Sequence, residues 1–218
     1  MSDGLIYEVL NNYSKDIDIS FKIILIGDSG VGKTSLSLKA VKNEYEDFYT
    51  PTIGFEFYSF FIRINYYIIK LNIWDTCGQE VYKSLITSFY RNSSLAIIMY
   101  SINDRQSYIN VESWLNEIKT ASNPDTKVFL IGNKCDLEEY RQVKTEEAHN
   151  FSVENRFDYF NETSAKTGLN AQEIFIHAAK ELYKPHLLTR KKNPKRIILE
   201  QEKEEENKSR REKNGCCK

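Results

Sequence analysis

The amino-acid sequence predicts an α/β fold with three layers, in which helices cover both faces of a mostly parallel sheet. Short apolar runs alternate with segments of helical period, as expected when crossover helices connect parallel strands. A glycine-rich turn separates the first apolar run from the first helical segment. The 218 residues are 41% hydrophobic and 13% aromatic, a composition that buries a core and excludes global disorder.

The predicted elements follow one another with a single break in the alternation. Two aromatic and β-branched runs flank a short polar stretch near Asn65, which indicates a hairpin. Asn170, with Glu173 three residues on, predicts the N-cap of the last helix, and Pro185 predicts its end. The expected strands are 21–26, 55–64, 67–74, 95–100, 128–131 and 159–163, and the expected helices are 34–42, 106–121, 145–155 and 170–183.

The charge distribution predicts one acidic domain followed by a basic tail. The formal net charge is −1, but residues 190–218 contain eleven basic and six acidic side chains, a net of +5. We therefore expect an N-terminal extension at 1–19, a folded domain at 20–184 and a largely disordered tail at 185–218. The near-neutral whole gives no reason to expect a nucleic-acid partner.

The cysteines, the N-terminus and the apolar runs indicate the cellular environment of the protein. The sequence has four cysteines without CxxC or Cys/His metal spacing, which favours a reducing environment. The N-terminus lacks the basic and apolar regions of a secretory signal. The longest apolar runs, such as 95–100, are far too short to span a bilayer.

One glycine-rich loop predicts a nucleotide triphosphate site. Residues 27–34 (GDSGVGKT) match GxxxxGKS/T directly after a predicted strand and before a predicted helix. The glycines let backbone N–H groups face phosphate oxygens, and the helix N-terminus adds a positive dipole end. A glycine-rich turn with a surface lysine is the alternative, which the strand–turn–helix placement disfavours. The predicted phosphate-binding residues are Ser29, Gly30, Val31, Gly32, Lys33, Thr34 and Ser35, with Lys33 at the β/γ-phosphates and Thr34 on Mg²⁺.

Two further motifs predict that the base is guanine. Asn133, Lys134 and Asp136 follow the predicted strand 128–131. The carboxylate of Asp136 offers two acceptors to the adjacent N1–H and amine of guanine, whereas adenine leaves it unpaired at a cost of about 1.5–3 kcal/mol per lost contact. The motif at Ser164, Ala165 and Lys166 follows the next strand, and the Ala165 N–H is expected to donate to the guanine carbonyl. Either motif alone is a common polar turn.

With these motifs the sequence resembles the Rab family of Ras-superfamily small GTPases over about residues 20–184. The Rab-type segments are 52–57 (TIGFEF), 70–80 (KLNIWDTCGQE) and 89–91 (FYR). The resemblance implies a P-loop NTPase fold with a six-stranded sheet, one antiparallel edge strand and five helices. It also implies binding of GTP or GDP with Mg²⁺ as cofactor, and two switch segments.

The resemblance also implies roles for single residues. Tyr45 would stack on guanine, Gly78 would contact the γ-phosphate through its N–H, and an exposed trio of Phe57, Trp74 and Phe89 would be read by effectors. Packing in the core is the alternative for these aromatics. The implied catalytic residues are Gln79, which orients the attacking water, with Lys33 and Thr52, and the implied Mg²⁺ ligands are Thr34, Thr52 and Asp75.

Departures from the family pattern leave alternatives open. Cys77 stands where the family usually has alanine, and its sulfur beside the γ-phosphate would slow hydrolysis. The main reading is a membrane-recruited GTP/GDP switch of intracellular vesicle traffic, with slow GTP hydrolysis stimulated by an activating protein. The rivals are a GTP-binding module with impaired hydrolysis, a P-loop kinase or ATPase, and a Ras- or Rho-like signalling GTPase.

The C-terminus resembles a Rab lipidation signal. Cys216 and Cys217 stand one residue from the end, and position 215 is Gly, so the sequence is not a CaaX box. Two geranylgeranyl groups give stable anchoring where one does not. The resemblance implies a monomer on the cytoplasmic face of an endomembrane, cycling with the cytosol. Its partners would be an exchange factor, an activating protein, an escort protein, a GDP-dissociation inhibitor and effectors.

Overall fold

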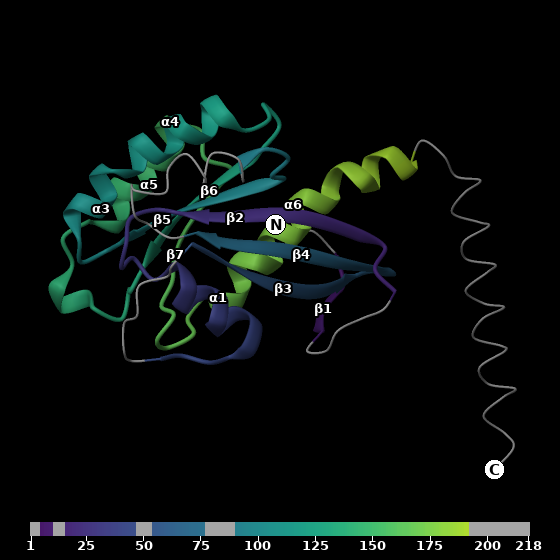
Figure 1. Ribbon diagram of the computed structural model, residues 1–218, viewed down its shortest axis with the longest axis horizontal. Coiled ribbons are helices and arrows are strands. Elements are labelled where there is room, and N and C mark those ends of the chain that lie inside the picture. Colours follow the sequence, from purple (N-terminus) through teal and green to yellow (C-terminus); the bar gives the residue numbers. More distant parts are fainter. Residues whose placement is uncertain (1–4, 11–15, 47–53, 77–89, 192–218) are drawn as a thin grey trace, which may run out of the picture. The chain divides into compact units, whose positions relative to one another are not determined.

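The computed structural model describes residues 5–10, 16–46, 54–76 and 90–191. Within these residues, one mixed sheet of seven strands has the order β1-β3-β4-β2-β5-β6-β7 (Figure 1). β2 to β7 pair in parallel except for the antiparallel hairpin β3–β4. The strands are β1 Tyr7–Leu10, β2 Ile19–Ile26, β3 Phe55–Ile64, β4 Tyr67–Thr76, β5 Leu95–Ser101, β6 Lys127–Asn133 and β7 Tyr159–Glu162. The predicted α/β class is confirmed.

The edge of the sheet differs from the expectation. We expected six strands with one antiparallel strand at the edge, and residues 1–19 as an extension outside the domain. Instead β1 pairs antiparallel with β3, from Tyr7 opposite Ile64 to Leu10 opposite Phe61. The N–H of Asn65, in the turn after β3, also donates to the carbonyl oxygen of Ile6. The extension therefore supplies a seventh strand, because β3 offers an unpaired edge to it.

Helices cover both faces of the sheet, as predicted. α1 lies on one face against β3 and β4, and α3, α4 and α5 lie on the other against β5 and β7 (Figure 1). The first turns of α6 share the face of α1, since the Gln172 side chain donates to the Ala40 carbonyl oxygen. The helices are α1 Lys33–Lys42, α3 Arg105–Ile109, α4 Val111–Ala121, α5 Thr145–Glu154 and α6 Ala171–Lys191, with a 3₁₀ turn at Glu138–Tyr140.

The core follows from the two periodicities of the sequence. The second half of β2, residues 23–26, and the whole of β5 are buried on both faces, as central parallel strands require. The α4 side chains Val111, Trp114, Leu115 and Ile118 recur at helical spacing and pack against one face of these strands. The predicted helix 106–121 is thus present as α3 followed by α4, joined at Asn110, whose backbone stays helical (φ −70°, ψ −12°).

The last helix extends past the predicted stop. Pro185 lies inside α6, which continues to Lys191. Proline has no N–H to donate to the carbonyl four residues earlier, so the helix lacks that one bond.

The chain divides into two compact units, 1–179 and 180–218, and the division falls within α6. None of the described helices is both long and apolar enough to cross a membrane.

Candidate nucleotide-binding site

The predicted phosphate loop lies between β2 and α1, at the carboxyl end of a central strand. The ammonium group of Lys33 donates to the carbonyl oxygens of Gly27 and Asp28, both at 2.8 Å, and the side chain is only 6% exposed. The ammonium group of Lys33 is therefore held against the backbone of the loop, near the N-terminus of α1. A phosphate bound there would meet both this charge and the helix dipole.

Two glycines of the loop are required by space as well as by backbone conformation. Gly27 has φ 135°, and a Cβ there would stand 2.2 Å from the carbonyl oxygen of Met99 on β5. Gly32 has φ 95°, and its Cβ would stand 2.3 Å from the side-chain nitrogen of Asn133. Real Cβ atoms do not approach so closely, so a side chain at Gly27 would force the Met99 backbone to shift, and one at Gly32 would force the Asn133 side chain to shift.

Asn133 joins the phosphate loop to both predicted base-binding motifs. Its amide nitrogen donates to the Val31 carbonyl oxygen at 2.8 Å, and its amide oxygen accepts from the Ala165 N–H at 3.3 Å. The residue is 1% exposed, at the end of β6. The three motifs follow β2, β6 and β7, which run parallel in one sheet, so they meet at the edge where those strands end. The predicted convergence is therefore present in the structure.

The predicted base-reading carboxylate is held in place by the second motif. The Ser164 hydroxyl donates to Asp136 Oδ1 at 2.5 Å and accepts from the Thr167 N–H at 3.0 Å. Asp136 is exposed, whereas Ser164 and Ala165 are buried. Lys134 adopts a left-handed backbone (φ 65°), and burial lowers the pKa of its ammonium group. The site thus presents an oriented carboxylate beside a partly buried lysine.

A magnesium ion fits the pair formed by Thr34 and Asp75. The Thr34 hydroxyl donates to Asp75 Oδ2 at 2.5 Å, which brings the two predicted ligands together from α1 and β4. The other carboxylate oxygen, Oδ1, is buried without a hydrogen-bond partner among the described residues. Burial raises the pKa of Asp75 to about 6, partly offset by Thr34 and Lys33. Oxygen ligands of this kind suit Mg²⁺, and a cation would relieve the cost of the buried charge.

The predicted effector aromatics form a partly exposed cluster on β3 and β4. Phe57 is 47% exposed and meets Trp74 edge-to-face at 5.3 Å between ring centroids. Phe55, also half exposed, lies 5.4 Å from the same ring. Trp74 is itself partly buried and packs against the core. The alternative of core packing thus holds in part for Trp74, while Phe57 faces solvent.

The remaining predicted residues fall into two groups. Ser29 and Lys166 are exposed, Ser35 is partly buried, and Tyr45 is 37% exposed beyond the end of α1. Their predicted nucleotide contacts stay predictions. The others lie outside the residues that the structure describes: Thr52, Cys77, Gly78, Gln79, Phe89, Cys216 and Cys217.

Sequence reasoning missed two residues that contact the phosphate loop. Asn110 and the indole of Trp114 both donate to the carboxylate of Asp28, at 2.6 and 2.8 Å. They are 82 and 86 residues away in the sequence. Trp114 lies in the predicted helix 106–121 and is 5% exposed in the structure, but no local signal pointed to the contact of its N–H with the loop.

Comparison with known proteins agrees with this fold. The model of the Ras family matches residues 22–184. The chain is 42% identical to "Ras-related protein Rab5A" of Oryza sativa subsp. japonica over 161 residues, 74% of this chain and 79% of the relative. It is 39% identical to "Ras-related protein Rab5" of Nicotiana tabacum over 84% and 90%, and 39% identical to "Ras-related protein Rab-13" of Rattus norvegicus over 78% and 83%.

The fold and the site define a P-loop nucleotide-binding protein of the α/β class. The matched family and the relatives place it more narrowly: the chain belongs to the Ras family of small GTPases, and within it to the Rab group.

Proposed function

We propose that this protein is a GTP/GDP-regulated switch of intracellular vesicle traffic with slow intrinsic GTP hydrolysis. The observation that supports it most is the position of Asn133, whose single amide bonds both the phosphate loop and the Ala165 loop. A nucleotide with its phosphates on Lys33 and its base between Asp136 and Ala165 would occupy both halves at once. Because Asn133 links the phosphate loop to the base loop, the site suits a ligand that has both a phosphate group and a base.

Guanine specificity follows from the chemistry of Asp136. Its carboxylate is oriented by Ser164, and only guanine presents two adjacent donors to two such acceptors. Thr34 and Asp75 would hold Mg²⁺, joined in the GTP state by Thr52, and the ion would neutralise phosphate charge. Lys134 would cover the base plane with its aliphatic stem, and Tyr45 would stack on the ring.

We propose that hydrolysis depends on the segments at Thr52 and at Gly78 and Gln79. Gln79 would orient the attacking water, while Thr52 and the Gly78 N–H would contact the γ-phosphate. Loss of that phosphate removes the partner of both segments, which is how a switch reports the bound nucleotide. With no arginine assigned to the site, the intrinsic rate would be low and an activating protein would supply the missing charge.

The aromatic cluster of Phe55, Phe57 and Trp74 suits an effector surface, with Phe89 as its further member. Exposed aromatic side chains are enriched where proteins bind one another. The ammonium group of Lys70 lies 5.7 Å from the Phe57 ring centroid and that of Lys22 5.4 Å from Trp74, so basic groups rim the cluster. An apolar partner segment with acidic flanks would complement this surface.

Membrane recruitment would come from the C-terminus. Prenyl groups on Cys216 and Cys217, delivered with an escort protein, would anchor the protein to the cytoplasmic face of an endomembrane. A GDP-dissociation inhibitor would return it to the cytosol, and an exchange factor would reload it. Replacing both cysteines by serine should leave nucleotide binding intact and abolish co-sedimentation of the cell-derived protein with membranes.

Competition binding with fluorescent GDP tests the central proposal. GTP should displace the probe and ATP should not, while Asp136→Ala should weaken GDP binding at least about tenfold because the guanine donors lose their acceptors. Asp125→Ala, the same substitution at an exposed aspartate in the turn before β6, is a matched control for general damage. Tight ATP binding together with a neutral Asp136→Ala would refute the proposal in favour of an ATPase or kinase.

Single-turnover hydrolysis with Cys77→Ala tests the rival reading of a GTP-binding module. If the sulfur hinders the reaction, the alanine variant should hydrolyse GTP faster than the wild type. Equal rates would remove Cys77 as an inhibitory feature and leave ordinary slow hydrolysis.

A further inference from the structure

The phosphate loop contains an acidic side chain whose two oxygens are bound by a distant helix pair. Asp28 Oδ2 accepts from the side-chain amide of Asn110 at 2.6 Å, and Oδ1 accepts from the indole N–H of Trp114 at 2.8 Å. Both donors are neutral, and hydrogen bonds to a carboxylate are stronger than those between neutral groups. We name the three residues Asp28, Asn110 and Trp114 the loop clamp.

The clamp acts on the loop next to its lysine. The backbone carbonyl oxygen of Asp28 accepts from the Lys33 ammonium group at 2.8 Å. A side-chain carboxylate one residue after Gly27 would repel a bound triphosphate if it turned toward it. Because Asn110 and Trp114 bind both oxygens of Asp28, the carboxylate is directed toward α3 and α4 and away from the ligand. The same contacts hold the backbone at Asp28, whose carbonyl oxygen orients Lys33.

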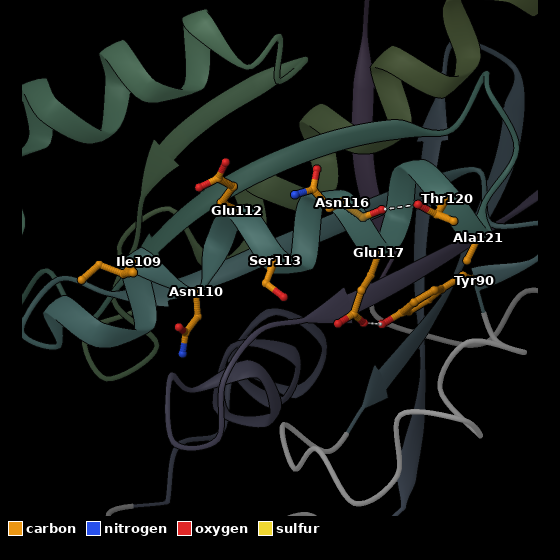
Figure 2. Close-up of a pocket in the computed structure, with 9 residues that line it drawn as sticks. All are labelled: Tyr90, Ile109, Asn110, Glu112, Ser113, Asn116, Glu117, Thr120 and Ala121. Carbon is orange, nitrogen blue, oxygen red and sulfur yellow. Dashed lines mark hydrogen bonds between the residues drawn. The ribbon is translucent and has the colours of Figure 1, made fainter.

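The two donors are themselves held in place. The Asn110 amide oxygen accepts from the Gln106 side chain at 2.9 Å, so the amide nitrogen is the atom turned to Asp28. Trp114 is 5% exposed, within the core cluster that includes Leu115 and Ile118. Figure 2 shows Asn110 at the junction of α3 and α4, on the rim of a surface cavity of about 670 Å³. Asn110 is therefore oriented by a second hydrogen bond, and Trp114 is packed into the core.

We propose that Asp28 is a positioning residue for nucleotide retention, and that the loop clamp holds the phosphate loop in the shape that binds phosphate. This inference rests on the proposed function. Breaking the clamp should speed nucleotide release, because the phosphate loop and Lys33 would no longer be held by hydrogen bonds to α3 and α4.

Exchange of the two clamp side chains is the decisive experiment. Asn110→Asp alone removes the amide donor and sets two carboxyl groups face to face. Release of fluorescent GDP from the Mg²⁺-loaded full chain should then be at least about tenfold faster. Adding Asp28→Asn reverses the bond, because the amide introduced in the loop can donate to the carboxylate introduced on the helix and still accept from Trp114. The double variant should return to within about threefold of the wild-type rate.

A second pair of variants separates positioning from general loosening of the core. Trp114→Phe removes the indole N–H and keeps an aromatic ring, so release should rise about tenfold. Ile118→Val trims the same helix in the same core cluster away from Asp28, and should release GDP at the wild-type rate. The thermal midpoint of each variant, measured in parallel, gives the stability that each one loses, and release is compared at a temperature well below both midpoints.

The outcomes are distinguishable. If the wild type does not bind GDP, the proposed function fails together with the inference. If the wild type binds GDP and Asn110→Asp releases it at the wild-type rate, the inference alone is overturned. It is also overturned if Asp28→Asn fails to rescue Asn110→Asp, or if Ile118→Val speeds release as much as Trp114→Phe does.

Discussion

At the scale of single residues, Asn133 shows why an amide is needed where three motifs meet. Its nitrogen donates to Val31 and its oxygen accepts from Ala165, and the side chain is buried. A carboxylate could not donate, and an apolar side chain could do neither. Either replacement would leave a buried backbone group unpaired, at a cost of about 1–3 kcal/mol.

Gly32 offers a direct test of this junction. A Cβ at Gly32 would collide with Asn133, whereas a Cβ at Gly30 meets nothing within 4 Å, and both residues have positive φ. In nucleotide-free protein we expect Gly32→Ala to lower the free energy of unfolding by about 2–4 kcal/mol and Gly30→Ala by about 1–2 kcal/mol. Urea denaturation measures both. Equal losses would mean that Asn133 moves aside without cost.

Asp75 is the residue whose burial is costly without a cation. Its pKa, raised to about 6, means that the folded protein holds the proton more tightly than the unfolded chain. Below about pH 4 both states are protonated and nothing is lost. Between about pH 4 and 6 stability falls as pH rises, and above that range the full cost, about 3 kcal/mol, remains.

We therefore predict that Asp75→Asn stabilises the protein in the absence of nucleotide and Mg²⁺. The gain should reach about 2–3 kcal/mol at pH 7 and vanish near pH 4, because asparagine does not ionise and can still accept from Thr34. Chemical denaturation across this pH range is the measurement. The same variant should lose the stabilisation by Mg²⁺ with GDP. A constant difference at all pH values would contradict the account.

At the scale of elements, β1 is the strand that sequence reasoning did not find. The strand is only four residues long and includes the charged Glu8, which gives too short a pattern to detect, and the mostly polar residues that follow it, 11–18, favoured an extension. The strand forms because β3 presents an open edge whose Ile62 and Ile64 are fully buried. The formation of β1 therefore depends more on the open edge of β3 than on the sequence of β1 itself.

Removal of residues 1–10 tests the contribution of this strand. We expect a loss of about 2 kcal/mol in the free energy of unfolding, since Val9 and Leu10 are partly buried and the edge of β3 becomes exposed. GDP affinity should be unchanged, because the phosphate and base loops end other strands. Glu8→Ala is the control: its pair with Arg63 is solvent-exposed and should be worth less than about 1 kcal/mol. Unchanged stability on truncation would show that β1 contributes nothing.

Pro185 shows the limit of a local rule. Proline disfavours a helical conformation for the residue before it and removes one hydrogen bond, so we expected α6 to stop there. The helix instead continues to Lys191. The rule describes a cost of about 3 kcal/mol rather than a prohibition, and the turns on both sides of Pro185 stay helical.

At the scale of the whole molecule, folding and ligand binding should be strongly linked. The phosphate loop, the base loops and the Thr34–Asp75 pair come from β2, β4, β6 and β7, so the ligand would join elements across the sheet. A ligand at a thousand times its dissociation constant stabilises the folded state by about 4 kcal/mol.

Removing Mg²⁺ and nucleotide with EDTA and gel filtration should accordingly lower the thermal midpoint by about 10 °C, which differential scanning calorimetry measures. Restoring Mg²⁺ with GDP should recover the midpoint, while Mg²⁺ with ADP should not. A thermal midpoint that does not change with these additions would argue against a nucleotide site at this edge of the sheet.

Much of the candidate site was predictable because its signals are local. The loop from Gly27 to Thr34, the motif around Asp136 and the motif around Ala165 each follow an apolar strand, and parallel strands end at one edge. The pairing of Thr34 with Asp75 was implied only by the family resemblance. The contacts of Asp28 with Asn110 and Trp114 had no signal at all, because they join residues more than eighty apart through side chains alone.

The sequence by itself determined the fold class, the order of its main strands and helices, and the phosphate- and base-binding motifs, since periodicity and short-range spacing are properties of neighbouring residues. The tertiary structure alone decided that β1 completes the sheet, that α6 passes Pro185, and that Asn133 and Asp28 tie the phosphate loop to distant elements. Those outcomes depend on which edges, faces and donors the rest of the chain brings within reach, and contacts of that kind are formed only once the sheet is assembled.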